Sequence, residues 1–316
     1  MDILRGDLRK GTPVQGPLAL TVGNFDGLHK GHQYLLDRLK KESESRSLES
    51  VVLSFHPHPN QVITGQVVEL LFDLEEKVKA MESLGVDCFA LQDFSLDFAQ
   101  QSAEDFLRQY LFKIFKPSYL LFGHDFNFGK GGSGKFELAN QIGKEYGCVV
   151  EQEIPFLMDG KIVSSTAIRS ALKAGEVHTA GSMLGRPYKI KGNIVHGQGL
   201  GKQWGIPTAN LAEIQTLLPG KGVYGGYAVY KENKYKAVLN IGMRPTVSSS
   251  GAPSVECHIL DFQSDIYGEM LEFQFFNKIR EERKFPGKLE LIEQIRKDIE
   301  SVRTAKFMES VFESRN

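Results

Sequence analysis

Two patterns of apolar and polar positions divide the chain, and they change near residue 185. In the first half, short apolar runs alternate with longer segments whose apolar residues recur at helical spacing. The apolar runs predict strands at residues 18–23, 51–55, 88–91, 119–122 and 149–153. The helical spacing predicts helices at residues 31–44, 75–84, 102–112 and 135–146. Such repeated units predict a doubly wound α/β domain with a mainly parallel sheet.

The second half has short β-rich runs separated by glycine-rich turns, which predict a small antiparallel β-barrel or sandwich. Its expected strands cover residues 188–196, 224–230, 237–241, 255–262 and 270–276. One helical pattern follows at residues 287–310, and its apolar positions indicate a packing element: Leu289, Ile292, Ile295 and Ile299. We therefore expect two domains, residues 1–184 and 185–316.

Composition narrows the class of protein. A chain of 316 residues fits two domains, and a formal net charge of −1 gives no sign of a nucleic-acid or membrane partner. No apolar run approaches the roughly 20 residues that span a bilayer, and the N-terminus has no apolar core typical of a secretory signal. The three cysteines are scattered, which argues against disulfides or structural zinc and favours the cytoplasm. The sequence carries no signal for oligomeric state.

The strongest chemical signal is the run from Gly23 to His32, which reads GNFDGLHKGH and joins a strand to a helix. Gly31 allows a tight turn with room for a phosphate, and the helix start offers free N–H groups. His29 and His32 can donate hydrogen bonds to phosphate oxygens as charge builds on them. This pattern indicates nucleotidyl transfer, which depends mainly on positioning and charge stabilisation.

Three further segments are expected at the ends of the same sheet's strands. Prolines hold His58 at the first, and Asp125 can accept hydrogen bonds at the second, where Phe126 and Phe128 either flank a flat ring or pack in the core. The third segment places Ser165 and Thr166 at a helix start and Arg169 one turn on, where they either cap the helix or hold phosphate.

A glycine-rich loop in the second half, residues 197–205, ends in Pro207, Thr208, Ala209 and Asn210. Its N–H groups can surround a polyphosphate. Thr208 and Asn210 share a face of an extended segment, and their oxygens can hold a hydrated Mg²⁺ beside the phosphates. Further on, strand alternation places Glu256 and His258 on one face and Cys257 on the other.

These motifs resemble two families in succession. The first half resembles the FAD synthetase branch of the nucleotidylyltransferases, and the second half resembles riboflavin kinase, so that the chain is similar to the bifunctional prokaryotic enzymes. The resemblance implies that riboflavin is phosphorylated by ATP to FMN, and that FMN then attacks the α-phosphorus of ATP to give FAD and pyrophosphate. ATP, riboflavin, FMN and FAD would be its ligands and Mg²⁺ its cofactor.

The resemblance also implies roles for residues. In the first half, ATP and FMN would be bound by Gly23, Asn24, Phe25, Asp26, Gly31, His58, Asp125, Ser165, Thr166 and Arg169, with His29 and His32 catalytic. In the second half, ATP and flavin would be bound by Gly199, Gly201, Lys202, Pro207, Thr208, Asn210, Tyr224, Asn240 and Arg280. Glu256 would be the base for the riboflavin hydroxyl. Arg280 either reaches the ligands or belongs to a solvated face.

Some positions depart from the family pattern. Lys202 stands for the usual arginine, which keeps the charge but loses the fork geometry, and Gly132 lies in a loop that usually carries another basic residue. A Walker loop at residues 129–135 is excluded because no serine or threonine follows Lys135. The alternatives are an enzyme with one of the two activities and a flavin-binding regulator without turnover. The presence of Glu256 and of the histidine pair argues against both.

Overall fold

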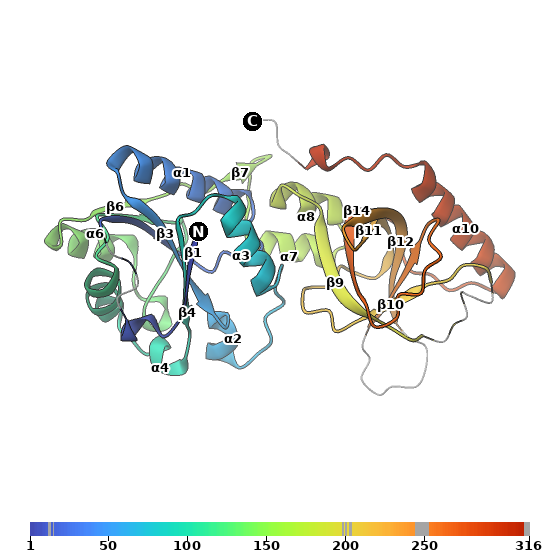
Figure 1. The fold of residues 1–316 in the computed structure, drawn as a ribbon, viewed down its shortest axis with the longest axis horizontal. Coiled ribbons are helices and arrows are strands. Elements are labelled where there is room, and N and C mark those ends of the chain that lie inside the picture. Colours follow the sequence, from blue (N-terminus) through green and yellow to red (C-terminus); the bar gives the residue numbers. More distant parts are fainter. Residues whose placement is uncertain are drawn as a thin grey trace. The chain divides into compact units, whose positions relative to one another are not determined.

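The computed structural model describes residues 1–11, 14, 16–197, 199, 201, 204–243 and 253–312. The chain divides into two compact units (Figure 1). Unit 1 comprises Met1–Val68 and Leu74–Val163, and unit 2 comprises Glu69–Asp73 and Ser164–Asn316. Helices α7 (Ser165–Lys173) and α8 (Val177–Leu184) thus belong to the compact unit of the second half, and the domain boundary at 184/185 stays a prediction.

Unit 1 is built on a six-stranded sheet in the order β1-β4-β3-β2-β5-β6, and all its pairings are parallel. Its strands are β1 (Asp2–Gly6), β2 (Leu18–Val22), β3 (Glu49–His56), β4 (Cys88–Asp93), β5 (Tyr119–Phe122) and β6 (Val149–Gln152). Its longer helices are α1 (Lys30–Arg46), α3 (Leu74–Ser83), the π-helix η2 (Phe106–Phe115) and α6 (Phe136–Glu145). Shorter elements are α2 (Pro59–Thr64), α4 (Leu96–Ala99), α5 (Ala103–Asp105) and the hairpin of β7 (Leu157–Met158) and β8 (Lys161–Ile162). The expected doubly wound parallel sheet is confirmed.

Both faces of this sheet are covered, as near-continuous apolar strands require. Leu18, Leu20 and Val22 of β2 point to the face where η2 and α6 complete one apolar cluster. The alternate residues of the same strand point to the opposite face, where α1 packs against β2 and β3 and buries Leu35, Leu36 and Leu39.

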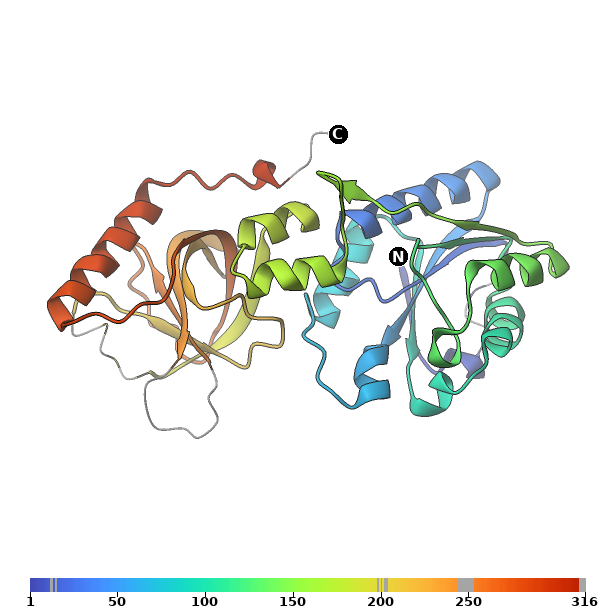
Figure 2. The same ribbon diagram turned by 180° about the vertical axis from the view of Figure 1, so that it is seen from behind.

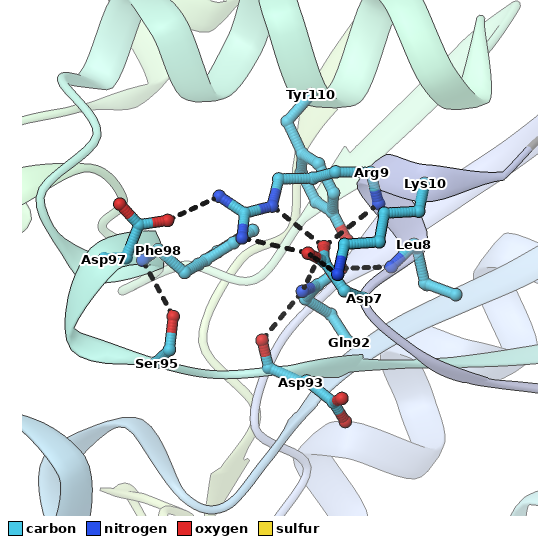
Figure 3. A network of polar contacts seen from close by, with 10 residues as sticks. All are labelled: Asp7, Leu8, Arg9, Lys10, Gln92, Asp93, Ser95, Asp97, Phe98 and Tyr110. Carbon is cyan, nitrogen blue, oxygen red and sulfur yellow. Dashed lines mark hydrogen bonds and ion pairs between the residues drawn. The ribbon is translucent and has the colours of Figure 1, made fainter.

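The edge strand β1 was not predicted from the sequence, because all of its residues are exposed or half-buried. It pairs with β4, and a polar network follows it directly (Figure 3). The side-chain oxygen of Gln92, fully buried at the end of β4, accepts hydrogen bonds from the Leu8 N–H at 2.9 Å and the Tyr110 hydroxyl at 2.8 Å. Arg9 pairs with both carboxylate oxygens of Asp7, at 2.8 and 3.0 Å. Polar contacts therefore hold this edge where apolar burial is small.

The Asp7–Arg9 pair makes a prediction about acid stability. Hydrogen bonds from Arg9 lower the pKa of Asp7 from 3.8 to about 2. A depressed carboxyl pKa stabilises the fold above the unfolded-state pKa, and this contribution is lost as pH falls from about 4 to about 2. We expect Asp7→Asn to lower the stability of the β1 edge by about 1–2 kcal/mol at pH 7. Hydrogen exchange of the β1 amides should show the difference, and it should shrink towards pH 2.5. A difference independent of pH would contradict this account.

Unit 2 contains a closed antiparallel barrel in the order β10-β13-β12-β11-β14-β9 (Figure 2). Its strands are β9 (Tyr188–Val195), β10 (Ala209–Ala212), β11 (Gly222–Tyr230), β12 (Asn233–Met243), β13 (Pro253–Ile259) and β14 (Met270–Arg280). Helix α8 packs against β9 and β14, and α10 (Lys288–Thr304) packs against β11 and β12. The predicted barrel with its C-terminal helix is confirmed.

The packing of α10 differs from the expectation in one respect. Val302 and Ile299 join an apolar cluster with strand residues of the barrel, but Leu289 is 80% exposed. The prediction of a packing role for Leu289 was wrong. It lies in the first turn of α10, and the buried side of the helix is centred on its last turns, at Asp298 and Val302.

Candidate functional sites

The segment of residues 23–32, here called the histidine turn, follows the carboxyl end of β2. Strand β2 lies between β3 and β5, and the chain passes from β2 to β3 on one side and from β5 to β6 on the other. This is a topological switch point, where open α/β sheets bind ligands beyond the carboxyl ends of their strands. The helix start of α1 adds backbone N–H groups at the same place.

The backbone of the histidine turn is strained. Phe25 and Leu28 have φ angles of 50° and 41°, in the left-handed region that side chains rarely adopt. A Cβ at Gly31 would lie 3.2 Å from the ring of His29, so the glycine makes room for that ring. The approach of a phosphate to Gly31, expected from the sequence, stays a prediction.

The two histidines form a stacked pair with ring centroids 3.7 Å apart. His29 is the N-cap of α1, and its Nδ1 accepts the backbone N–H of His32 at 3.3 Å. An accepting Nδ1 assigns the proton of the neutral ring to Nε2, which is then a hydrogen-bond donor. The capping bond therefore sets the tautomer of His29.

His32 is held in its neutral form. Burial lowers its pKa well below 6.5, and nearby His29, Lys77 and His124 act in the same direction. Its Nδ1 is buried and has no hydrogen-bond partner among the described residues. Two protonated rings stacked this closely would also repel each other. The pair thus places neutral polar nitrogens at the start of α1.

Lys77, on α3, is a member of this site that the sequence analysis missed. It is buried, and its Nζ donates to the carbonyl oxygen of Asn24 at 2.7 Å. Desolvation lowers the pKa of Lys77 to about 8, while the carboxylate of the buried Asp26 acts against this shift. The sequence spacing could have indicated its burial, because Lys77 falls on the same helical face as Leu74, Val78 and Met81.

Two other predicted residues of unit 1 follow neighbouring strands. His58 follows β3, is half-buried and caps α2, with its Nδ1 accepting the Asn60 N–H at 3.2 Å. Asp125 follows β5 and is exposed. Phe126 and Phe128 stack on Phe122 and join the apolar core. Of the two interpretations for these phenylalanines, the structure therefore favours core packing.

Ser165, Thr166 and Arg169 belong to unit 2, at the start of α7. Ser165 and Thr166 begin the helix as expected, but Ser164 provides its N-cap by accepting the Ala167 N–H. The hydroxyls of Ser165 and Thr166 are therefore not needed for that cap. Arg169 donates to the Glu69 carbonyl at 2.9 Å. Whether these residues meet the histidine turn stays a prediction.

In the barrel, strand register places three predicted residues side by side. Asn210 of β10 and Asn240 of β12 are both directly opposite Glu256 of β13. Directly opposite residues share a face, with Cβ atoms about 5 Å apart. All three are half-buried, whereas Cys257 is fully buried inside the barrel. We call Asn210, Glu256 and Asn240 the outer row, and the predicted alternation around Cys257 is confirmed.

The glycine-rich loop approaches one end of the outer row. A Cβ at Gly197 would overlap the amide of Asn210, and a Cβ at Gly201 would lie 3.4 Å from the hydroxyl of Thr208. His258, on the same face as Glu256, contacts the Pro207 carbonyl at 2.8 Å through Nδ1. This contact anchors the Pro207–Asn210 segment to β13. Gly199 is described without its neighbours, and the predicted Lys202 lies outside the described residues.

Tyr224 and Arg280 have structural partners. Tyr224 is fully buried and its hydroxyl bonds to the Gly220 carbonyl, so the structure gives it a packing role, and its ligand contact stays a prediction. Arg280 donates from Nε and Nη2 to the buried carboxylate of Asp298, at 3.0 and 2.9 Å to Oδ2. This pair joins the end of β14 to α10. A ligand contact for Arg280 also stays a prediction.

The Arg280–Asp298 pair predicts a stability effect. Removing one partner of a buried ion pair leaves the other charge uncompensated, which costs about 3–5 kcal/mol. We expect Asp298→Ala to destabilise unit 2 by about 3 kcal/mol because Arg280 is partly exposed. Urea unfolding followed by the fluorescence of Trp204, the single tryptophan of the chain, reports on this unit. Glu300→Ala, on the exposed side of α10, is the control. Equal midpoints for the two variants would contradict the prediction.

Comparison with known proteins covers nearly the whole chain. Residues 12–167 match the family model described as FAD synthetase, and residues 184–306 match that of riboflavin kinase. A bifunctional riboflavin kinase/FMN adenylyltransferase of Haemophilus influenzae is 37% identical over 305 residues, covering 96% of this chain and 98% of the relative. One of Bacillus subtilis is 34% identical over 290 residues, covering 90% and 91%.

A solved structure supports the fold. A protein of Streptococcus pneumoniae, described as a macrolide-efflux protein, has a TM-score of 0.85 and 29% identity, covering 97% of this chain and 100% of that one. In the described part of the present chain, none of the helices has the length and apolar character needed to cross a membrane.

Proposed function

Because this chain belongs to the family of bifunctional riboflavin kinase/FMN adenylyltransferases, it makes FMN from riboflavin and FAD from FMN, and we propose that each reaction has its own site. We assign residues 1–184 to adenylyl transfer and residues 185–316 to the kinase. The observation that carries the proposal is that the histidine turn and the outer row lie in different compact units. The substrates are riboflavin, FMN and ATP.

For adenylyl transfer, the FMN phosphate attacks the α-phosphorus of ATP and pyrophosphate leaves. The Nε2–H of His29 and the neutral ring of His32 donate to the phosphate oxygens on which charge develops. The N–H groups at the start of α1 add further donors. The capping bond of His29 holds its ring in place, and donors fixed in advance in this way stabilise a transition state by preorganisation.

The family match extends to residue 167, so we assign Ser165 and Thr166, with Arg169 one turn on, to the phosphates of this reaction. We assign His58 and Asp125 to the same reaction. Support comes from their positions, directly after β3 and β5, the two strands that flank β2.

For the kinase step, Glu256 accepts the proton of the riboflavin 5′-hydroxyl as its oxygen attacks the γ-phosphorus of ATP. The register supports this role, because Asn210, a predicted phosphate-side residue, is directly opposite Glu256. The loop of Gly199, Gly201 and Lys202 would cover the phosphates, with Arg280 and Tyr224 as further ligand-binding residues of the family pattern.

The donor set of the barrel fits Mg²⁺. The described residues contain no cluster of three or more histidine, cysteine or acidic side chains suited to a metal. Thr208 and Asn210 instead offer a hydroxyl and an amide oxygen, both half-buried, and Mg²⁺ in ATP sites commonly uses one or two protein oxygens with phosphate oxygens. When bound there, Mg²⁺ would neutralise charge on the phosphates.

We place the protein in the cytoplasm, since its three cysteines are free and buried.

Incubation with riboflavin and ATP-Mg²⁺, followed by chromatography, tests the function. FMN and FAD together are expected. FMN alone would show a kinase with an inactive first half, and flavin binding without product would show a regulator.

A further inference from the structure

Lys77 is a buried cation on α3 whose contact with the histidine turn calls for an explanation. A lysine is almost never fully buried unless it is paired, because desolvation of its ammonium is costly. Lys77 lies on α3, more than 40 residues after the turn it contacts, and is 9% exposed. It donates to the Asn24 carbonyl at 2.7 Å. That carbonyl belongs to the segment that continues β2 into the strained Phe25.

The charges around Lys77 come from several elements. Asp26, in the same turn, is buried and favours the charged ammonium. Lys77 in turn disfavours protonation of His32, together with His29 from the turn and His124 from the end of β5. Burial lowers the pKa of His56 at the end of β3, and Lys77 and Arg5 lower it further, whereas Asp93 raises it. The ammonium thus acts on two imidazoles, those of His32 and His56, and is itself stabilised by one carboxylate.

Resting on the adenylyl transfer assigned above to this turn, we propose that Lys77 is a positioning residue for that reaction. Its hydrogen bond fixes the Asn24 carbonyl and with it the path of the chain into His29. Its positive charge adds to the burial that keeps His32 neutral, so that the stacked histidines act as uncharged donors, while Lys77 supplies the positive charge of the site. Lys77 touches no reacting atom in this role and acts through the turn and through His32.

The proposal explains why the lysine occupies an apolar helical face. Lys77 and Met81, one turn apart on α3, are both buried, and the Lys77 ammonium reaches the turn. A methionine would fit the same space, which makes Lys77→Met a substitution that removes the charge and the donor with little loss of packing. Lys77→Arg keeps a permanent charge, and Lys79→Met, at an exposed position on the same helix, is the matched control.

The first test does not require activity. Histidine ring resonances, followed by NMR as pH is varied, give the titration midpoint of His32 in the full-length protein. We expect Lys77→Met to raise this midpoint by about one pH unit, because a like charge has been removed. Lys77→Arg and Lys79→Met should leave it low. An unchanged midpoint in Lys77→Met would overturn the proposal.

The second test measures FAD formed from supplied FMN. We expect Lys77→Met to lower kcat/KM by about tenfold or more, since a misplaced reacting group is costly. In the wild-type protein kcat/KM should decline above about pH 8, where Lys77 loses its charge. Lys77→Arg should move that alkaline limb to higher pH. A wild-type rate in Lys77→Met, or the same alkaline limb in Lys77→Arg, would count against the proposal.

The two tests separate this inference from the function it rests on. If the wild-type protein forms no FAD, the assignment of adenylyl transfer fails, and the NMR titration still decides whether Lys77 controls His32. If FAD forms and the His32 midpoint does not respond to Lys77→Met, the function stands and the role of Lys77 is refuted.

Discussion

Glu256→Ala is expected to reduce FMN formation from riboflavin by about 10²–10⁴-fold, the range that a general base contributes. The residue lies on the outer face of β13, opposite Asn210 and Asn240, where the alanine leaves both asparagines in place. The loss should appear in kcat, since the carboxylate acts on the proton that moves in the transition state. Product chromatography with riboflavin and ATP-Mg²⁺ measures it.

The same Glu256→Ala protein should still convert supplied FMN to FAD at the wild-type rate. Glu272→Ala is the matched control, because Glu272 is a carboxylate on β14 of the same barrel, paired with Lys189 at 3.1 Å. It should retain kinase activity. Loss of FAD formation in Glu256→Ala, with an intact fold, would refute the division into two sites.

His29→Ala and His32→Ala are expected to have the opposite selectivity. Each removes a donor of the proposed phosphate site, and loss of one such preorganised donor costs about 10²–10³-fold in kcat. FAD formation from FMN should fall by this amount, while FMN formation from riboflavin should stay unchanged. Separate assays of the two steps, with riboflavin or FMN supplied, check both expectations.

His29 also caps α1, so that His29→Ala removes the helix cap together with the proposed hydrogen-bond donor. Asparagine is a favoured N-cap, and His29→Asn therefore keeps the helix start while it removes the ring and its Nε2–H. We expect the Tm of His29→Asn to equal that of the wild-type protein. We expect the same variant still to be defective in FAD formation. Wild-type activity in this variant would show that His29 serves only as a cap.

Local sequence pattern was sufficient for most of the fold. The apolar run at residues 119–122 coincides with β5, and the helix expected at residues 135–146 is α6 with one residue fewer at each end. Strand β1 has no such run. It is defined by pairing with β4 and by the Gln92 network, which are long-range contacts that local periodicity does not contain.

The candidate sites show the same limit. His29, His32 and Glu256 were found because their motifs are local. Lys77 was missed because its partner, the Asn24 carbonyl, is 53 residues away in the sequence and belongs to the backbone, which has no compositional signal. The alignment of Asn210 with Glu256 depends on the register between β10 and β13, and that register is set by barrel closure rather than by either segment alone.

The closed barrel also limits how this sequence can change. Deleting or inserting one residue within β13 would turn Cys257 to the exterior of the barrel and Glu256 to its interior. The carboxylate of Glu256 would then be buried among apolar side chains. Neighbouring strands on both sides prevent β13 from sliding to relieve the error. The connections around β13 can therefore vary in length, whereas the number of residues within the strand is fixed by the barrel.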